Sequence, residues 1–248
     1  MSIMKVRFGR LLVSIAISSI LSFSGAAPLS AQDYPQTTAY LQELYLYENT
    51  IYRTFEGYAR EAKIDGEYRL YSLFSALAES KLVHLTLIEA ILNELNIGVG
   101  ALPGTTVETS TTEENVRQFE FLVSQKMPQY YSWMKRRILA ENFQGVGTLM
   151  SYIRKSTGQY RGLLDRLKPY MRSYNGSPNP VDPRLFDYYV CQICGTVRPT
   201  VPLGNCPTCL QSSSYYQKVQ LSLPKGFSAP QRKESRVEEA PPIVLPIQ

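Results

Sequence analysis

Along residues 36–63, side chains recur in alternating steps of three and four residues, which is the period of one face of an α-helix. This first stripe is mostly apolar and consists of Leu41, Leu44, Glu48, Ile51, Phe55, Tyr58 and Ala62. Residues 67–95 repeat the pattern with Phe74, Leu77, Lys81, His84, Ile88 and Leu92. The two segments therefore predict two long amphipathic helices whose inward faces carry a few polar side chains.

The period breaks between Ile97 and Thr112, in a stretch that is rich in Gly, Thr and Val and contains one proline. Such a stretch predicts a long connection. The run Thr-Thr-Glu-Glu at 111–114 opens a third predicted helix, with the stripe Val116, Phe119, Val123, Lys126, Tyr130, Trp133 and Arg137. A fourth predicted helix covers residues 144–172, with the stripe Val146, Leu149, Ile153, Thr157, Tyr160, Leu164 and Leu167.

The order of these elements predicts a mainly α protein with a ferritin-like four-helix bundle over residues 34–174. Short turns near Asp65-Gly66 and Asn142-Phe143 join the helices within each half, and the long middle connection joins the two halves. Two helical hairpins with one long crossover are typical of ferritin-like topology.

The first 31 residues have the pattern of a secretory signal peptide. Lys5, Arg7 and Arg10 precede an uncharged, largely apolar run over residues 11–23, and small residues follow up to Ala31. The pattern predicts cleavage after Ala31 and export to a periplasm or an equivalent lumen. Retention of this segment as an uncleaved anchor is the alternative, and only then do we expect a membrane association, although the apolar run is short for a membrane span.

Charge argues against a nucleic-acid partner. Removing the leader lowers the formal net charge from +5 to +2, because it takes away three positive charges and no negative ones. The rest of the sequence contains no dense run of Lys and Arg, so no nucleic-acid binding is predicted.

The last third of the chain divides into three parts. Residues 175–185 are predicted to be a linker, because glycine and several prolines forbid continuation of the helix. Residues 186–219 contain every cysteine of the chain and form a small predicted module. Residues 220–248 are rich in proline and charge, which predicts a tail that is disordered or that docks on a partner in extended form.

Cys191, Cys194, Cys206 and Cys209 form two C-x2-C pairs separated by eleven residues. The two-residue spacer lets both sulfurs of a pair face one ion, so two pairs can hold a metal tetrahedrally. Thiolates favour iron or zinc, and the ligands alone do not separate the two. Two disulfides are the alternative in an exported chain.

The segments YVCQICG and NCPTC, with tyrosines at 188, 189, 215 and 216, resemble a rubredoxin-type iron knuckle. This resemblance implies a single iron that cycles between two redox states and carries one electron. One residue departs from the pattern, because Leu210 stands where the second knuckle usually has glycine. Either Leu210 adopts a positive φ or the turn shifts.

The bundle followed by this knuckle resembles rubrerythrin over nearly the whole mature chain. In the first half, the resemblance rests on Glu48 within YLYENTIYRTFEGYAREAKIDG and on the ESKLVH run that ends at His84. It implies a di-iron carboxylate centre that reduces peroxide with electrons from the rubredoxin iron. In the family, Glu from two helices and Glu-x-x-His from the other two supply the ligands.

Carried over by position, most of these ligands are replaced in this chain. The positions are Glu48, Lys81, His84, Val123, Lys126, Thr157 and Tyr160. Glu48 and His84 keep a ligand type, and His84 is the only histidine of the chain. We therefore expect no di-iron centre, and we expect His84 to be a hydrogen-bonded core residue.

Without metals, Glu48 would be an isolated carboxylate in an apolar seam, which is unfavourable unless a cation pairs with it. We predict that Lys81, with Lys126 as the second candidate, places its ammonium group there. The alternative is that both lysines extend outward to solvent.

Three functions follow from these features. The first is one-electron transfer at a four-cysteine iron site, with a protein redox partner and without an active peroxidase. The second is a zinc-stapled structural or docking subunit, which would contact a larger assembly through its tyrosine-rich helices and tail. The third is a residual peroxide reductase. A homodimer remains open.

Overall fold

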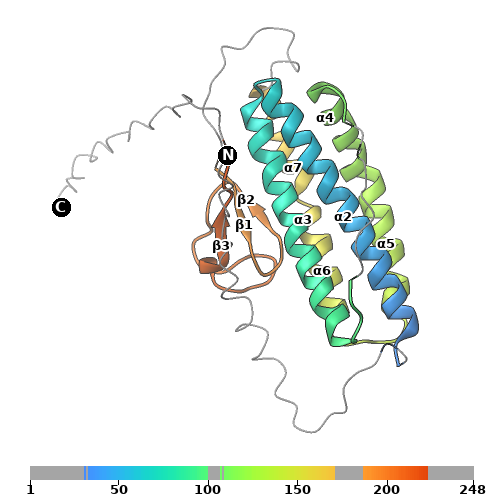
Figure 1. Cartoon of the computed structure of the whole chain (residues 1–248). Helices are drawn as coiled ribbons and strands as arrows, with labels where there is room; N and C mark the ends of the chain where they lie inside the picture. Colours follow the sequence, from blue (N-terminus) through green and yellow to red (C-terminus); the bar gives the residue numbers. More distant parts are fainter. Residues whose placement is uncertain (1–30, 32, 100–106, 108, 171–186, 223–248) are drawn as a thin grey trace, which may run out of the picture.

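The computed structural model describes residues 31, 33–99, 107, 109–170 and 187–222 of the 248-residue chain. The predicted leader (1–31), linker (175–185) and tail (220–248) lie almost entirely outside these residues, and so does part of the long middle connection. These assignments stay predictions. Figure 1 shows a bundle of helices with a small sheet packed against one side.

The first two predicted helices are confirmed. Helix α2 spans Pro35–Ile64 and helix α3 spans Tyr68–Glu94. Gly66 turns the chain between them at a positive φ of 76°, a conformation in which a Cβ would be strained. Every position of the two predicted stripes is buried, so the period of the sequence identifies the inward faces correctly.

The second half forms two broken helices. The third predicted helix consists of α4 (Thr112–Phe121), a π-helical turn η1 (Leu122–Lys126) and α5 (Met127–Ile138). It begins as predicted, since the Thr111 hydroxyl accepts a hydrogen bond from the backbone N–H of Glu114. The fourth consists of α6 (Val146–Thr157) and α7 (Tyr160–Asp165), followed by a 3₁₀ turn, η2 (Lys168–Tyr170).

The long helices pack side by side around a common core. Helix α2 contacts α3 and α5, and α6 contacts α3 and α5, so the two hairpins lie side by side (Figure 1). The ferritin-like bundle is therefore confirmed. Within the described part of the chain, no helix has both the length and the apolar character that crossing a membrane requires.

Because of the π-helical turn, the second half of the third predicted stripe is wrong. Val116 and Phe119 are buried as predicted, but beyond the turn the buried residues lie one position later than predicted. They are Met127, Tyr131, Met134 and Ile138, where the sequence period predicts 126, 130, 133 and 137. Pro128 supplies the reason, because it has no N–H to bond the carbonyl four residues back and its ring clashes with that carbonyl. The widened turn, closed by Met127 N–H on the Leu122 carbonyl, inserts one extra residue.

The cysteine module is a three-stranded antiparallel sheet in the order β2-β1-β3. Its strands are β1 (Tyr189–Cys191), β2 (Val197–Arg198) and β3 (Tyr216–Lys218), and a 3₁₀ turn, η3 (Ser213–Tyr215), precedes β3. Val190 pairs with Val197 on one side and with Gln217 on the other. The sheet is small, so we expect the cysteine site to contribute much of its stability.

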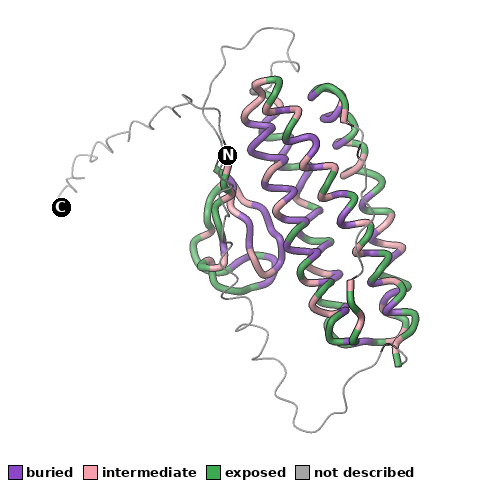
Figure 2. Tube along the Cα trace, in the orientation of Figure 1, coloured by how far each residue is buried: buried purple, intermediate pink, exposed green. Residues whose placement is uncertain are grey.

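The module packs against α3, which is therefore covered on two sides. Strands β1 and β2 contact α3, and α6 contacts α3 from the bundle. Figure 2 shows the result, since α3 carries buried positions around a wide arc, whereas α5 is buried along one narrow stripe. Helix α3 is thus the element that links the bundle core to the cysteine module.

Candidate metal centre

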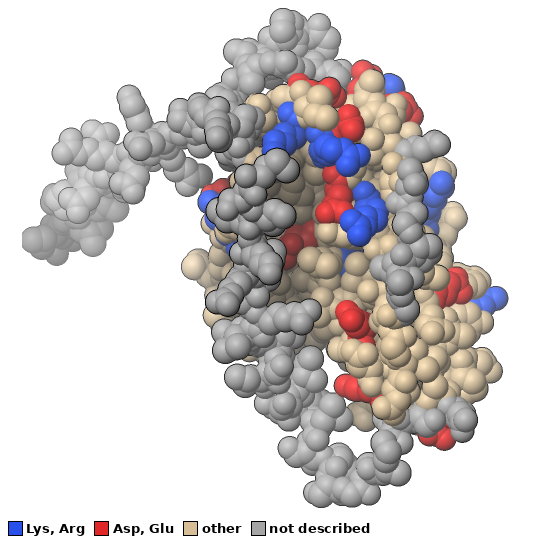
Figure 3. All heavy atoms as spheres, viewed as in Figure 1, with Lys and Arg blue, Asp and Glu red and all other residues tan. Residues whose placement is uncertain are grey.

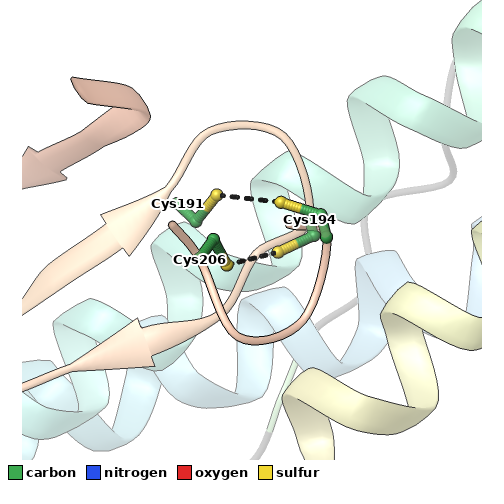
Figure 4. A group of neighbouring side chains, drawn as sticks. Cys191, Cys194 and Cys206 are labelled. Carbon is green, nitrogen blue, oxygen red and sulfur yellow. Dashed lines mark hydrogen bonds between the residues drawn. The ribbon is translucent and has the colours of Figure 1, made fainter. Parts of the chain in front are cut away.

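The four cysteine sulfurs converge on one point, as their spacing predicts. Cys191 ends β1, and the ligand atoms of all four cysteines lie within 4.8 Å of one another. Cys191 Sγ is 3.8 Å from Cys209 Sγ, and Cys194 Sγ is 3.6 Å from Cys206 Sγ. Metal–sulfur bonds of about 2.3 Å in a tetrahedron place the sulfurs about 3.8 Å apart. The donor set therefore fits one tetrahedral ion, and Figure 4 shows the labelled sulfurs facing one another.

The same distances argue against the disulfide alternative. All four cysteines are free and buried. A disulfide needs a sulfur–sulfur distance of about 2.05 Å, well below the separations in this cluster. Among the described residues, these four are the one group of His, Cys, Asp or Glu side chains that converges as a metal site would require.

Two matching turns present the sulfurs. Gly195 N–H donates to the Cys191 carbonyl at 2.8 Å, and Leu210 N–H donates to the Cys206 carbonyl at the same distance. Gly195 has a φ of 73° and Leu210 a φ of 62°. Of the two alternatives for Leu210, the residue has therefore adopted the positive φ, and the turn keeps its shape. Its side chain is 73% exposed, so it escapes a clash but retains backbone strain.

Hydroxyl groups contact the sulfurs from within the module. Tyr216 Oη donates to Cys206 Sγ at 3.2 Å, and Thr196 Oγ1 lies 3.2 Å from Cys194 Sγ. A hydrogen bond from Cys194 lowers the pKa of Cys191 to about 6, whereas burial raises the pKa of Cys209 to about 12. The thiols thus differ in acidity, and a bound cation would favour the thiolate at each of them.

A second cluster of polar side chains lies inside the bundle. Lys81 Nζ is 3.0 Å from Glu48 Oε2 and donates at 2.9 Å to Tyr131 Oη, and Tyr131 Oη donates to Glu48 Oε1. The side chains of Lys81 and Glu48 are 0% exposed. The predicted ion pair is confirmed for Lys81, and the alternative of an outward lysine is wrong at this position.

His84 completes the cluster on its other side. Its Nδ1 lies 3.0 Å from Glu48 Oε2, and because a carboxylate accepts only, Nδ1 is the donor. In the neutral ring, Nε2 then carries no proton and lies 3.0 Å from the Ser156 hydroxyl oxygen. Burial lowers the pKa of His84, which favours this neutral form. His84 is a hydrogen-bonded core residue, as expected.

Charge balance in the cluster favours an ionised Glu48. Burial by itself raises the pKa of a carboxyl group, but the Lys81 ammonium and hydrogen bonds from His84 and Tyr131 lower the pKa of Glu48 to about 2. Burial also lowers the pKa of Lys81, and Glu48 opposes this shift. The aromatic ring of Tyr160, whose centroid lies 5.4 Å from Lys81 Nζ, adds further stabilisation of the cation.

The two clusters touch through the first cysteine turn. His84 Nε2 lies 3.3 Å from the Cys194 carbonyl oxygen, and Ser80 Oγ donates to the Gly195 carbonyl. A Cβ on Gly195 would lie 2.6 Å from His84 Nε2 and 2.9 Å from the Ser80 carbonyl oxygen. Gly195 therefore serves the close approach of the module to α3 as well as the turn.

The remaining predicted positions divide into two groups. Thr157 and Tyr160 are buried, with Thr157 Oγ1 on the Ile153 carbonyl at 2.7 Å and Tyr160 Oη 2.6 Å from Ser80 Oγ. Val123 and Lys126 lie on the π-helical turn, where no residue is buried. Lys126 as the second partner of Glu48 is wrong, because the extra residue turns it outward and its Nζ lies 5.2 Å from the Phe121 ring centroid.

Sequence reasoning missed three polar residues of this region. Tyr131 was assigned to no role because the uninterrupted period places Tyr130 inward, and Pro128 is the signal that could have corrected the register. Ser80 and Ser156 flank His84, but single serines on helices carry no pattern that separates them from solvent-facing ones. Their roles depend on where the cysteine module docks.

The fold and the site together define a class of structure, a ferritin-like bundle followed by a rubredoxin-like four-cysteine module. Solved structures of nigerythrin, a rubrerythrin, share this arrangement. The mixed-valence state matches with a TM-score of 0.57 and the partially reduced state with 0.58, each at 16% identity over 80% of this chain and 90% of that chain. A fully reduced, all-ferrous state matches at 0.56. At this identity the likeness shows the fold alone.

Comparisons of the sequence give no further match. No protein-family model matches the chain, and no curated protein matches it.

Proposed function

We propose that this chain is an exported one-electron-transfer protein that holds a single iron at Cys191, Cys194, Cys206 and Cys209. The observation that carries the proposal is the convergence of four buried sulfurs at separations that suit one tetrahedral ion. The shared fold with nigerythrin, one state of which is described as all ferrous, supports iron as the metal. Iron bound by four thiolates would supply reversible one-electron chemistry.

The residues around the sulfurs suit a site that changes its charge. Tyr216 directs its hydroxyl at Cys206 Sγ, and such hydrogen bonds to thiolate favour the reduced, more negative state. Cys209 is 8% exposed while the other three sulfur-bearing residues are 0% exposed. The site is therefore shielded from water, and Cys209 is the most accessible of its four cysteines.

We further propose that the bundle holds no di-iron centre. The Lys81 ammonium lies against Glu48 at 3.0 Å, within the face of α3 where the family resemblance implies a metal ligand. A buried positive charge at that place repels metal cations, and a single carboxylate and a single imidazole are too few ligands for two irons. The bundle then acts as a scaffold for the cysteine module.

The proposal of export rests on the leader sequence alone. Lys5, Arg7 and Arg10 before an apolar run and small residues support it. Mass spectrometry of the mature N-terminus would test it, and a protein that still begins at Met1 in its natural host would contradict it.

Metal analysis and optical spectroscopy of protein purified from its natural host test the metal centre. We expect about one iron per chain, a red oxidised form and bleaching on reduction, because thiolate-to-iron charge transfer requires the ferric state. Cys194→Ser should lose most of the colour and the iron. Two disulfides in a metal-free protein would overturn the proposal.

A zinc-stapled structural subunit is the second candidate. The observation that favours it is the docking of the module on α3 through Gly195, Ser80 and His84, a contact that needs an ordered turn but no redox chemistry. Zinc in the host-purified protein and no spectral change with a reductant would favour this function. Iron with a reversible potential would exclude it.

A further inference from the structure

A pocket beside the cysteine module has charged lining residues that are all positive. This pocket of about 480 Å³ lies between α6, α7 and the module, and Lys155, Arg166 and Arg198 line it. Its other lining residues include Val197, Pro199 and Pro207 and no Asp or Glu. A pocket lined by apolar residues and by charges of a single sign is suited to recognise a group of the opposite charge.

Arg198 adds an incompletely paired guanidinium group to the lining of this pocket. Arg198 lies on β2, and its Nε is buried without a hydrogen-bond partner among the described residues. A buried guanidinium N–H that stays unpaired is unfavourable, and a carboxylate accepts two parallel hydrogen bonds from a guanidinium. The side chain is therefore suited to an incoming anionic group.

The positive surface extends beyond this pocket. A neighbouring pocket of about 440 Å³ is lined by Lys135 and Arg136 of α5 and by Arg154 of α6, again with no acidic residue. Lys155 of the first pocket and Arg154 of the second are consecutive in α6, so both pockets border the same turn of this helix. On the face shown in Figure 3, Lys and Arg side chains lie among Asp and Glu. A surface of six cations over two pockets is larger than a small anion needs.

The first pocket also lies next to the candidate metal ligands. Pro207 and Thr208 line it, and they are the two residues between Cys206 and Cys209. A protein seated on this pocket would contact the second knuckle directly. The same module also exposes the apolar side chains of Val201, Leu203 and Leu210.

We propose that the surface formed by Lys135, Arg136, Arg154, Lys155, Arg166 and Arg198 docks an acidic one-electron carrier protein. This inference rests on the proposed function, because it assigns the carrier that exchanges electrons with the cysteine site. With iron held by the four cysteines, the reduced carrier would give up one electron and the ferric site would accept it, and no covalent bond would form or break. Opposite charges would raise the association rate and make it sensitive to salt.

Stopped-flow reduction of the iron-loaded full chain by reduced flavodoxin, an acidic carrier, tests the proposal. The test variant is Lys155→Glu with Arg166→Glu, since both side chains are exposed. The control is Arg53→Glu with Arg60→Glu on α2, which changes the net charge equally at exposed positions. We expect the test variant to slow reduction at least about tenfold at low salt, and the control to change it less than about twofold. The wild-type rate should fall steeply as salt is added.

A small neutral reductant separates failure of this inference from failure of the proposed function. Photoreduced 5-deazariboflavin should bleach wild type and both variants at the same rate. If it bleaches none of them, the redox function itself fails. The docking surface is wrong if deazariboflavin bleaches all three proteins while the rate of reduction by flavodoxin does not depend on salt. It is also wrong if both variants slow reduction by flavodoxin equally. A membrane is the other possible partner. If wild type and the control bind phosphatidylglycerol vesicles, the test variant does not, and the rate of reduction by flavodoxin is the same in all three, the surface binds a membrane and the proposal is overturned.

Discussion

Lys81 and Glu48 form a buried ion pair at 3.0 Å between α3 and α2, and neither side chain is exposed to solvent. Breaking such a pair leaves one charge alone in an apolar interior, whereas replacing both partners removes the problem. Glu48→Gln or Lys81→Met alone should each lower the free energy of unfolding by about 3–5 kcal/mol, and the double variant should be close to wild type. Denaturant unfolding of the four proteins measures the coupling. Additive effects would show that the two charges do not stabilise each other.

The pH dependence of stability should reflect the ionisation of Glu48. Its pKa is about 2 in the folded protein, against 4.5 for the ordinary group. A lowered folded-state pKa gives stability that is complete above pH 4.5 and is lost as the pH falls toward 2. The difference corresponds to a contribution on the order of 3 kcal/mol. Between pH 7 and pH 3, the free energy of unfolding measured with denaturant should therefore fall more steeply in wild type than in Glu48→Gln/Lys81→Met. Parallel profiles would contradict the assignment.

Two neighbouring tyrosines offer a matched pair of substitutions. Tyr131 Oη bonds both Glu48 and Lys81, whereas Tyr130 Oη is buried with no hydrogen-bond partner among the described residues. Tyr131→Phe removes hydrogen bonds to charged groups and should cost about 1.5–3 kcal/mol. Tyr130→Phe should be neutral or slightly stabilising. Thermal and denaturant unfolding compare the two, and equal effects would argue against the buried network.

Gly195 should tolerate no side chain. Alanine there meets His84 Nε2 at 2.6 Å and also sits at a φ of 73°. Gly204 has a φ of 91° with open space around it, so Gly204→Ala reports backbone strain alone. We expect Gly204→Ala to cost about 1–2 kcal/mol and Gly195→Ala clearly more, with protease sensitivity increased in the cysteine module. If both variants lose the same stability, the module does not dock on His84 as the structure describes.

Peroxide chemistry should be absent or trivial. We expect total iron near one per chain, because Lys81 occupies a position where the family resemblance implies a carboxylate, and the four cysteines are the one group of His, Cys, Asp or Glu side chains among the described residues that converges as a metal site would require. Metal analysis and peroxide consumption with an excess of reductant check this expectation. Rapid turnover that Glu48→Ala abolishes, or three irons per chain, would show that the bundle holds metal after all.

The sequence alone determined the parts of this protein that depend on local periods. Every position of the predicted α2 and α3 stripes is buried, because an unbroken helix keeps one face through its whole length. The C-x2-C spacing identified the four converging sulfurs, since a two-residue spacer constrains both ligands within one turn. Lys81 could be paired with Glu48 because both lie on inward stripes and a buried carboxylate needs a cation.

Tertiary structure decided what depends on register and on contacts between distant segments. The extra residue of the π-helical turn moved Tyr131 inward and Lys126 outward, and the helical period contains no information about such an insertion. Docking of the cysteine module placed Gly195 against His84, 111 positions earlier in the chain, because the shapes of two separate surfaces match there. The same packing gathered Lys155, Arg166 and Arg198 around one pocket, although the sequence shows no basic run that joins them.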